Sequence, residues 1–361
     1  MKLLRLYWVV GELSGEMHAA SVISVLRQLH PNLHLRGMGG DAMAALGMEL
    51  AAHWRDYAVV GFIEVLQNLP RFIWLYRYLR RDILAYRPDR LILVDYPGLN
   101  LRLARWAVKH RIPVTYFIPP QLWAWNPGRV RSLRNELIQV LCILPFEPEF
   151  YAKHAVSAIY VGHPLVERLR DIEPFSWERP YIALLPGSRV HEVKHMLPVM
   201  VELVGLFPQY DFLVSKVSHL PEALYKNLAP GLLHIEGHTP ELLRGAMAAV
   251  VTSGTATLEA GLLGVPTVIL YKGNPLSYHI ARRLVQVPFI GLPNLILGER
   301  VFPELIQSDC TPQKVASALR EQLQKAEQIR QKLQQLRVLL GEQRTAETVA
   351  QLLLTATTDT G

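Results

Sequence analysis

The sequence predicts an α/β protein made of two doubly wound, Rossmann-like domains. Short apolar segments typical of buried parallel strands alternate with helical segments along most of the 361 residues. The series of strand, glycine-containing turn and helix begins at Leu3 and begins again at Tyr181. Between the two series, residues 174–180 contain two prolines and no periodicity, as expected of a linker. The chain is long enough for two separate cores.

Composition narrows the class of protein. Hydrophobic residues make up 50% of the chain and charged residues 19%, and no window of 18 uninterrupted apolar residues could form a transmembrane helix. The net charge of +7 favours anionic partners, but no nucleic-acid-binding motif is present, so we do not expect nucleic acid to bind. Cys142 and Cys310 imply no disulfide framework, and the first residues resemble a strand rather than a signal peptide. A reducing cytosol fits both features.

The N-terminal domain is predicted to cover residues 1–170. Its first strand, Leu3–Val10, leads into the turn Gly11 to Glu16 and then into a helix. The turn is not GxGxxG, so the dinucleotide-binding fingerprint is absent. Its glycines would let the backbone approach a ligand, to which Glu12 and Ser14 could hydrogen-bond. A tight turn without a ligand explains the pattern equally well.

Residues 54–86 have the most unusual composition of the chain. An apolar run at residues 58–66 precedes a stretch in which arginines are interleaved with bulky side chains. An amphipathic segment of this kind can lie in a membrane interface. The alternative is a helix packed on the core with a solvated basic face. The residues of interest here are Phe62, Trp74, Arg77 and Arg81.

The strand Arg90–Val94 ends at Asp95, which makes this aspartate a candidate general base. In open parallel sheets, ligands bind beyond the carboxyl ends of the strands. Asp95 could instead cap the next helix, Leu99 to His110.

A stiff loop follows the next strand, Val114–Ile118. Two prolines and two tryptophans, Trp123 and Trp125, lie within seven residues of this loop. Their large faces would suit sugar stacking or acyl contacts, and also simple packing. The strands Leu137–Leu144 and Ala158–Val161 complete the first predicted sheet.

The C-terminal domain is predicted to cover residues 171–340. Its first strand, Tyr181–Leu185, is followed by a turn with Ser188 and Arg189 and then by a helix. An arginine at such a turn can pair with a diphosphate beside the amides of the helix N-terminus. Further predicted strands are Asp211–Val214, Leu233–Ile235, Ala248–Thr252 and Thr267–Tyr271.

The segment around which the chain is organised is residues 251–271. A strand ends at Thr252, the turn Ser253-Gly254 follows, and a short apolar helix begins at Thr255. The first amides of this helix, including that of Ala256, could face an anion. Glu259 is its only charge and lies about one turn farther on, where it could hold a ribose. A buried βαβ crossover with an internal ion pair at this glutamate is the alternative.

His191-Glu192-Val193-Lys194-His195 matches the pattern H-E-x-x-H of zinc hydrolases. No third ligand is signalled nearby, and Lys194 adds positive charge. We therefore expect no metal here, although a zinc metallohydrolase remains the rival enzyme class.

The tail from Pro312 is predicted to form two helices separated at Gly341. The last segment, residues 341–361, would pack back on the N-terminal domain or exchange with a partner chain, giving a homodimer. The sequence does not choose between these arrangements.

Nine motifs in order along nearly the whole chain resemble the lipid-A-disaccharide synthase family of GT-B glycosyltransferases. Each motif is modest alone, and together they are specific. The motifs are Gly11-Glu12-x-Ser14-Gly15, Val59 to Leu66, Val94 to Pro97, Trp123-Ala124-Trp125, Leu144 to Glu147, Gly162-His163-Pro164, Leu185 to Arg189, Ser253 to Glu259 and Leu292-Pro293-Asn294.

The resemblance implies a GT-B fold with two domains facing across a cleft, and an inverting sugar transfer. UDP-2,3-diacylglucosamine would donate its sugar to the 6-hydroxyl of 2,3-diacylglucosamine 1-phosphate, with no cofactor and no metal. Asp95, Glu12 and Arg189 would act in catalysis. The UDP-sugar would contact Ser188, Arg189, Ser253, Gly254, Thr255, Ala256, Glu259 and Asn294.

The resemblance also implies a peripheral protein on the cytoplasmic face of the inner membrane of a Gram-negative-type bacterium. The residues that would face the acceptor and the membrane are Ser14, Phe62, Trp74, Arg77, Arg81, Trp123 and Trp125.

Two positions depart from the family pattern. Glu16 and Gly98 stand where the family usually has aspartate. Glu16 keeps a carboxylate, whereas Gly98 removes one near Asp95. A weakened or non-catalytic nucleotide-sugar-binding paralogue at the membrane is therefore a third possible class.

Overall fold

The computed structural model describes residues 3–57, 69–125, 127–274, 278, 285 and 287–358. The chain forms two compact units. The first contains Met1–Pro164 together with Gln343–Gly361, and the second contains Leu165–Glu342. Each is an α/β unit with one parallel sheet and helices interleaved between its strands, so the predicted fold class of two Rossmann-like domains is confirmed.

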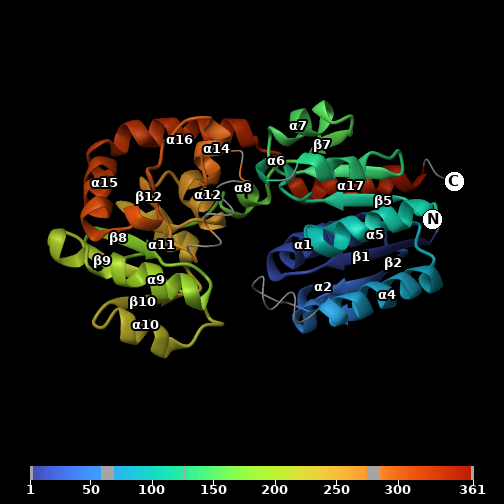
Figure 1. Cartoon of the computed structure of the whole chain (residues 1–361), viewed down its shortest axis with the longest axis horizontal. Helices are drawn as coiled ribbons and strands as arrows, with labels where there is room; N and C mark the ends of the chain where they lie inside the picture. The colour runs from blue at the N-terminus through green and yellow to red at the C-terminus, as the bar shows by residue number, and fades with distance from the viewer. Residues whose placement is uncertain are drawn as a thin grey trace. The chain divides into compact units, whose positions relative to one another are not determined.

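The sheet of the first unit has seven parallel strands in the order β3-β2-β1-β4-β5-β6-β7 (Figure 1). The order reverses between β1 and β4, which is the switch point where ligands bind in open α/β sheets. The strands are β1 (Leu4–Val10), β2 (Leu33–Gly39), β3 (Glu49–His53), β4 (Arg90–Val94), β5 (Val114–Phe117), β6 (Ile138–Cys142) and β7 (Ala158–Tyr160).

Helices cover both faces of this sheet. Alternate side chains of β1 point to opposite faces, so Tyr7 and Val9 join the core under α4 and α5, while Leu6 and Trp8 join the core under α1 and α17. The helices are α1 (Leu13–Leu29), α2 (Asp41–Ala45), α4 (Leu69–Tyr86), α5 (Pro97–Lys109), α6 (Leu122–Trp125), α7 (Glu147–Lys153) and α17 (Thr345–Thr358), with the 3-10 helices η1 (Trp54–Tyr57) and η2 (Pro127–Leu133).

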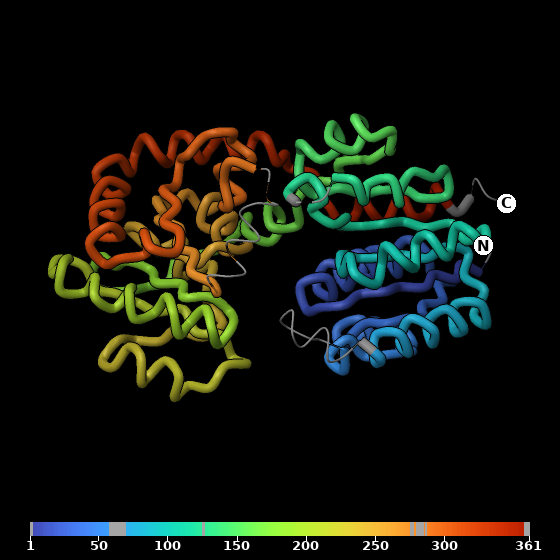
Figure 2. Tube along the Cα trace, in the orientation of Figure 1, coloured from blue at the N-terminus to red at the C-terminus, as the bar shows by residue number. Residues whose placement is uncertain are grey.

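The C-terminal helix α17 belongs to the first unit. Figure 2 shows its red segment beside the teal and green part of the chain. Val349, Ala350 and Leu353 of α17 are fully buried in the same core as Val22 and Ile23 of α1. The sequence left open where this tail packs, and in the structure it packs on its own chain.

The sheet of the second unit has six parallel strands in the order β10-β9-β8-β11-β12-β13. Its order reverses between β8 and β11, so this unit also has a switch point. The strands are β8 (Tyr181–Leu185), β9 (Asp211–Lys216), β10 (Leu233–Glu236), β11 (Ala248–Thr252), β12 (Thr267–Tyr271) and β13 (Glu304–Ile306).

One face of the second sheet forms a core with α9, α10 and α15, and α12 packs against α11, α14 and α16. The first residues of the second unit form α8, so the chain changes units before the segment 174–180 that we predicted as the linker. The helices are α8 (Pro164–Arg168), α9 (Val190–Val201), α10 (Glu222–Leu228), α11 (Thr239–Gly245), α12 (Thr255–Leu262), α14 (Leu292–Leu297), α15 (Pro312–Gln324) and α16 (Ala326–Leu340), with η3 (Val204–Leu206) and η4 (Gln307–Asp309).

Within the described ranges, no helix is both long enough and apolar enough to span a bilayer.

Candidate functional site

The first candidate site lies at the switch point of the first sheet, where β1 and β4 end side by side. Val10 pairs with Val94 in register, so the turn that contains Glu12 lies next to the turn that contains Asp95. Asp95 and Tyr96 have φ angles of 45° and 49°, a left-handed conformation that is rare for residues with a side chain. Strain of this kind persists only where neighbours hold it, and it is often found at functional sites.

Hydrogen bonds hold the Asp95 turn in place. The Tyr116 hydroxyl and the Asn100 side-chain amide each donate to the Asp95 carbonyl, at 2.8 Å. The Asp95 amide donates to the Phe117 carbonyl at 3.2 Å. The backbone of Asp95 is therefore fixed.

The electrostatic surroundings of Asp95 suit a base. Burial raises the pKa of Asp95 from 3.8 to about 6, and the charge and hydrogen bond of Glu12 contribute to the rise. A hydrogen bond from the Tyr96 backbone acts in the opposite direction and lowers this pKa. The hydroxyl of Ser14 donates to the exposed Glu12 carboxylate. A carboxyl with a pKa near 6 is a stronger base than an ordinary aspartate and is still ionised at neutral pH.

Glu16 has a structural role that the sequence did not reveal. Its carboxylate is buried, accepts from the Ala42 amide at 2.7 Å and accepts from the Trp54 indole at 2.6 Å. A Cβ at Gly40 would lie 2.2 Å from the same carboxylate. Glu16 thus joins α1 to the start of α2. The methylene that glutamate has beyond aspartate lets its carboxylate reach the Ala42 amide.

Trp123 was expected to face the acceptor or the membrane, but it is buried. Its indole donates to the Glu147 carboxylate at 3.0 Å and packs edge-on against Phe146. Burial raises the pKa of Glu147 to about 7, against the Trp123 hydrogen bond. Since its ring is enclosed, Trp123 supports the loop rather than offering a stacking face. The side chain of Trp125 lies outside the described part of the chain.

Helix α4 has one face in the core and one face in solvent. Leu75, Leu79 and Ile83 are fully buried, whereas Arg77 and Arg81 are exposed. Trp74 is 55% exposed and stacks on Tyr78 with 5.2 Å between ring centroids. Within the described residues, neither Arg77 nor Arg81 is within 4.0 Å of a carboxylate oxygen. Phe62 lies outside the described residues.

The second candidate site lies at the switch point of the second sheet. Arg189 precedes α9, and its guanidinium pairs with the Glu192 carboxylate at 2.8 Å. Glu192 also accepts from the amides of Ser188 and Arg189, at 2.9 and 3.2 Å. A Cβ at Gly187 would lie 2.4 Å from Glu192, so the glycine permits this contact. In this structure the carboxylate therefore occupies the position that we predicted for an anion.

The H-E-x-x-H pattern begins this same helix. His191 and His195 are four residues apart on α9, and the His195 Nδ1 lies 2.6 Å from the His191 carbonyl. Glu192 is used in the turn described above. Among the described residues, no group of three His, Cys, Asp or Glu side chains is placed to hold a metal ion.

The turn between β11 and α12 has the predicted strand–turn–helix form. Ser253 and Gly254 link the strand to Thr255, the first residue of α12, and Ala256 follows. The Thr257 hydroxyl donates to the Gly254 carbonyl at 2.8 Å. No side chain caps the first turn of α12, so its N-terminus is open to an anionic group.

Glu259 is 8% exposed and forms an ion pair with Arg168 of α8. Burial raises the pKa of Glu259, and the charge and hydrogen bond of Arg168 oppose that rise. The ion pair is the alternative that the sequence left open for this residue. Arg168 is a partner that sequence reasoning missed, because nothing in the spacing of residues 168 and 259 links them.

Asn294 is fully buried and uses all of its hydrogen-bonding capacity inside the protein. Its amide donates to the Phe302 carbonyl and to Glu304, at 2.8 and 2.9 Å. Its oxygen accepts from the amides of Val301 and Phe302, both at 2.9 Å. An asparagine side chain has two donors and two acceptor positions. Asn294 therefore fixes the segment between α14 and β13 and has no free group for a ligand.

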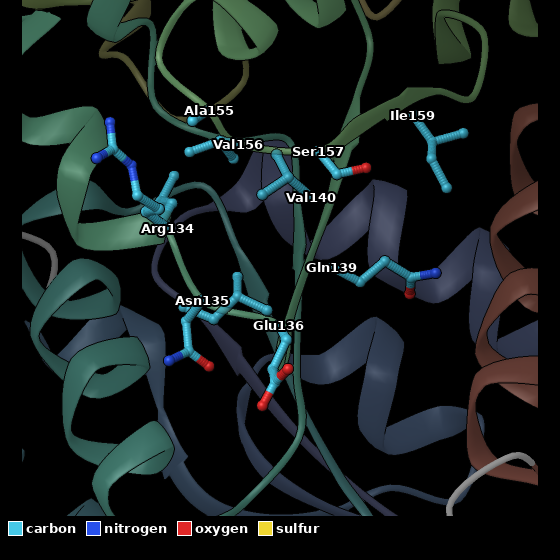
Figure 3. A pocket seen from close by; sticks show the side chains of 11 residues that line it. Arg134, Asn135, Glu136, Gln139, Val140, Ala155, Val156, Ser157 and Ile159 are labelled. Carbon is cyan, nitrogen blue, oxygen red and sulfur yellow. The ribbon is translucent and has the colours of Figure 1, made fainter.

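A pocket of about 520 Å³ lies on the first unit (Figure 3). Asn135 and Glu136 line it just before β6, and Val156 and Ser157 line it just before β7. It is thus at the amino ends of these strands. Ligands of open α/β sheets bind at the opposite, carboxyl ends, so we do not assign the substrate to this pocket.

Comparison with known proteins gives a consistent family. A family model described as lipid-A-disaccharide synthetase matches residues 6–356. A lipid-A-disaccharide synthase of Myxococcus xanthus (strain DK1622) is 38% identical, over 97% of each chain. Another from Syntrophus aciditrophicus (strain SB) is also 38% identical, over 96% of each chain.

Solved structures support the fold. The glycosyltransferase of kitacinnamycin has a TM-score of 0.66 at 15% identity, over 97% of this chain and 98% of that one. The UDP-GlcNAc 2-epimerase of Neisseria meningitidis, solved with UDP-GlcNAc, has a TM-score of 0.65 at 13% identity, over 98% of this chain and 100% of that one. At these identities the likeness concerns the fold alone.

The motifs, the two parallel sheets and the family match agree with one another along nearly the whole chain. The family expectation from the sequence is thereby confirmed. The chain belongs to the lipid-A-disaccharide synthase family and is a hexosyltransferase with the GT-B fold.

Proposed function

We propose that this protein transfers 2,3-diacylglucosamine from UDP-2,3-diacylglucosamine to the 6-hydroxyl of 2,3-diacylglucosamine 1-phosphate. The products are the β-1,6-linked lipid A disaccharide 1-phosphate and UDP. Family membership supports the reaction class. The observation that supports the mechanism is the Asp95 carboxyl at the switch point, beside Glu12, with its pKa raised to about 6.

In the proposed mechanism, Asp95 accepts the proton of the acceptor 6-hydroxyl. The oxygen of that hydroxyl attacks the anomeric carbon of the donor as the bond from this carbon to the UDP oxygen breaks. The proton ends on Asp95 and the electron pair leaves with UDP. A single displacement inverts the α-linked donor to a β-linked product. Glu12 tunes the base, since its charge contributes to the raised pKa of Asp95.

The donor would bind at the second candidate site. Arg189, with Ser188, would exchange Glu192 for the diphosphate, and the open N-terminus of α12 at Thr255 and Ala256 would face the same negative charge. Glu259 would hold the ribose hydroxyls while paired with Arg168. Asn294 would act indirectly, by fixing the segment that follows α14.

We further propose a peripheral location on the cytoplasmic face of the inner membrane. The exposed Trp74, Arg77 and Arg81 on one face of α4 support contact with an anionic surface. A homodimer through the C-terminal helices stays a prediction, since α17 packs on α1 of its own chain.

The deciding experiment is to incubate the purified protein with both acylated substrates in detergent and to detect the disaccharide by mass spectrometry. We expect product from the natural protein and none from Asp95→Asn, with equal UDP affinity in both. Product at the natural rate from Asp95→Asn would contradict its role as base. UDP binding without product from the natural protein would favour the non-catalytic paralogue.

A further inference from the structure

A strongly basic pocket of about 700 Å³ lies on the first unit between α5 and η2. Arg102 and Arg105 line it from α5, and Arg129 and Arg131 line it from η2. Gly98, in the first turn of α5, lines the same pocket. Four arginines from two segments thus place four guanidinium groups around one cavity.

No acidic side chain from this part of the chain offsets that charge. Residues 96–135 contain six arginines and one lysine but no Asp or Glu. Arg102, Arg105 and Arg131 are exposed, and within the described ranges none of the three is within 4.0 Å of a carboxylate oxygen. A group of like charges repels itself unless an anion neutralises it. The pocket therefore favours an anionic ligand.

The basic character continues beside this pocket. A second pocket, of about 470 Å³, shares Arg102 and Arg105 and adds Arg80 and Lys109. Arg80 lies over the ring of Trp106, 5.1 Å from its centroid, which fixes the direction of its guanidinium. The cationic surface thus extends from η2 across α5 to α4, the helix with the exposed Trp74.

The N-terminus of α5 adds to the attraction. The helix has 13 residues, and the side chain of Tyr96, its cap residue, forms no hydrogen bond with the first turn. Apart from its chain neighbours and the backbone of α5 itself, no atom lies within 4 Å of the position that a Cβ on Gly98 would occupy, so the approach is open. The helix dipole therefore acts together with the guanidinium groups on the same space.

We propose that this pocket binds the phosphate group of a phosphorylated lipid. Guanidinium groups bind phosphate through paired, charge-assisted hydrogen bonds, and arginine suits this geometry better than lysine. The phosphate could belong to the sugar 1-phosphate of the acceptor, an assignment that rests on the proposed function, or to a phospholipid headgroup of the bilayer. Because α5 begins two residues after Asp95, a phosphate held there would lie on the helix that directly follows the proposed base.

The test uses the full chain with Arg102→Gln and Arg131→Gln combined. A control with the same loss of charge is Lys226→Gln with Lys325→Gln. Both lysines are exposed, form surface ion pairs with a glutamate and belong to the second unit. First, calorimetry measures the affinity for glucosamine 1-phosphate and for UDP. Losing two charge-assisted contacts should weaken glucosamine 1-phosphate binding about tenfold or more, with UDP binding unchanged. The control should bind both like the natural protein.

Two further arms distinguish the source of the phosphate. If the acceptor supplies it, KM for 2,3-diacylglucosamine 1-phosphate in detergent rises about tenfold, while kcat and the KM for an acceptor without phosphate change little. If the bilayer supplies it, KM in detergent stays the same, while sedimentation with phosphatidylglycerol vesicles falls and that with phosphatidylcholine vesicles does not.

Equal glucosamine 1-phosphate affinity and equal vesicle binding in the natural and doubly substituted proteins would overturn the proposal. Arginine-dependent phosphate binding by a natural protein that makes no disaccharide would instead refute the proposed function and leave the pocket assigned. If the double variant fails to fold, the single variant Arg105→Gln gives the same test, because this exposed arginine lines the same pocket.

Discussion

Asp95 combines a strained backbone with a carboxyl that is costly to ionise. Its φ of 45° is held by Tyr116 and Asn100, and burial together with Glu12 raises its pKa to about 6. The base is active when ionised, so activity should rise with pH through that pKa.

We therefore predict that Glu12→Gln moves the acidic limb of the kcat/KM profile to lower pH. The natural protein should show a limb near pH 6, and removal of the Glu12 charge should lower the pKa of Asp95. Rates measured from pH 4.5 to 8 check this, with Ser14→Ala as the control that keeps the charge. An unchanged limb would mean that another group sets the profile.

The Arg168–Glu259 ion pair makes a second prediction. Arg168→Gln leaves a nearly buried carboxylate without its partner, and it should lower the free energy of unfolding by about 1–2 kcal/mol at pH 8, because Arg168 itself is half exposed. The loss should shrink toward pH 5. The pKa of Glu259 lies above its usual value and would rise further without Arg168, so the carboxyl takes up a proton as the pH falls.

The double variant Arg168→Gln with Glu259→Gln is the control for this pair. Removing both charges should recover most of the lost stability in urea unfolding. A loss of the same size in single and double variants would show that Arg168 stabilises by packing instead.

The sequence predicted some of these residues and not others for physical reasons. A carboxylate after a buried strand is visible in a sequence, so Asp95 and Glu12 could be brought together by topology alone. Asn294 was expected to contact the donor because it falls on a family motif, and a motif does not reveal that the protein itself uses all of its hydrogen-bonding groups. Trp123 was expected to face the acceptor or the membrane because of its stiff loop and the family resemblance. Its buried partner Glu147 lies 24 residues away, and no pattern in the sequence links the two.

At the level of elements, most strands were predictable because buried parallel strands are continuous apolar runs. The strand ends at Val94, Leu185 and Thr252 agree with the structure. The linker was misplaced. Prolines and mixed charge mark an irregular segment, but residues 174–180 lie inside the second unit, and the change of unit follows Pro164.

Helix α4 permits a prediction in which membrane binding changes while stability does not. Replacing Trp74 by Ala together with Arg77→Gln and Arg81→Gln should reduce binding to vesicles containing phosphatidylglycerol several-fold, most strongly at low salt. Stability should change little, since all three side chains are exposed. Sedimentation across a salt series measures the effect, and Lys226→Gln with Lys325→Gln is the matched control. Equal sedimentation would remove α4 from the membrane contact.

At the scale of the whole molecule, the first unit is made from two distant parts of the chain. The apolar face of α17 completes the core over α1, with Val349 and Leu353 fully buried. We predict that Leu353→Ala destabilises the first unit by about 2–4 kcal/mol. Amide exchange should speed up in β1 and α1 while the second sheet keeps its protection.

Val338→Ala is the control for that experiment. This residue lies on α16, is 78% exposed and belongs to the second unit, so it should alter neither region. Equal acceleration in both sheets after Leu353→Ala would show that the two units unfold together.

Because α17 is the last helix to be synthesised, the order of synthesis affects the order in which the two units can fold. A ribosome releases residues from the amino end onward, and the second unit is one continuous segment, 165–342, that emerges before α17. The first unit therefore cannot complete its core until α17 has been synthesised. The second unit can complete its own core before then. During that interval the uncovered apolar side of α1 is the surface that a chaperone would recognise.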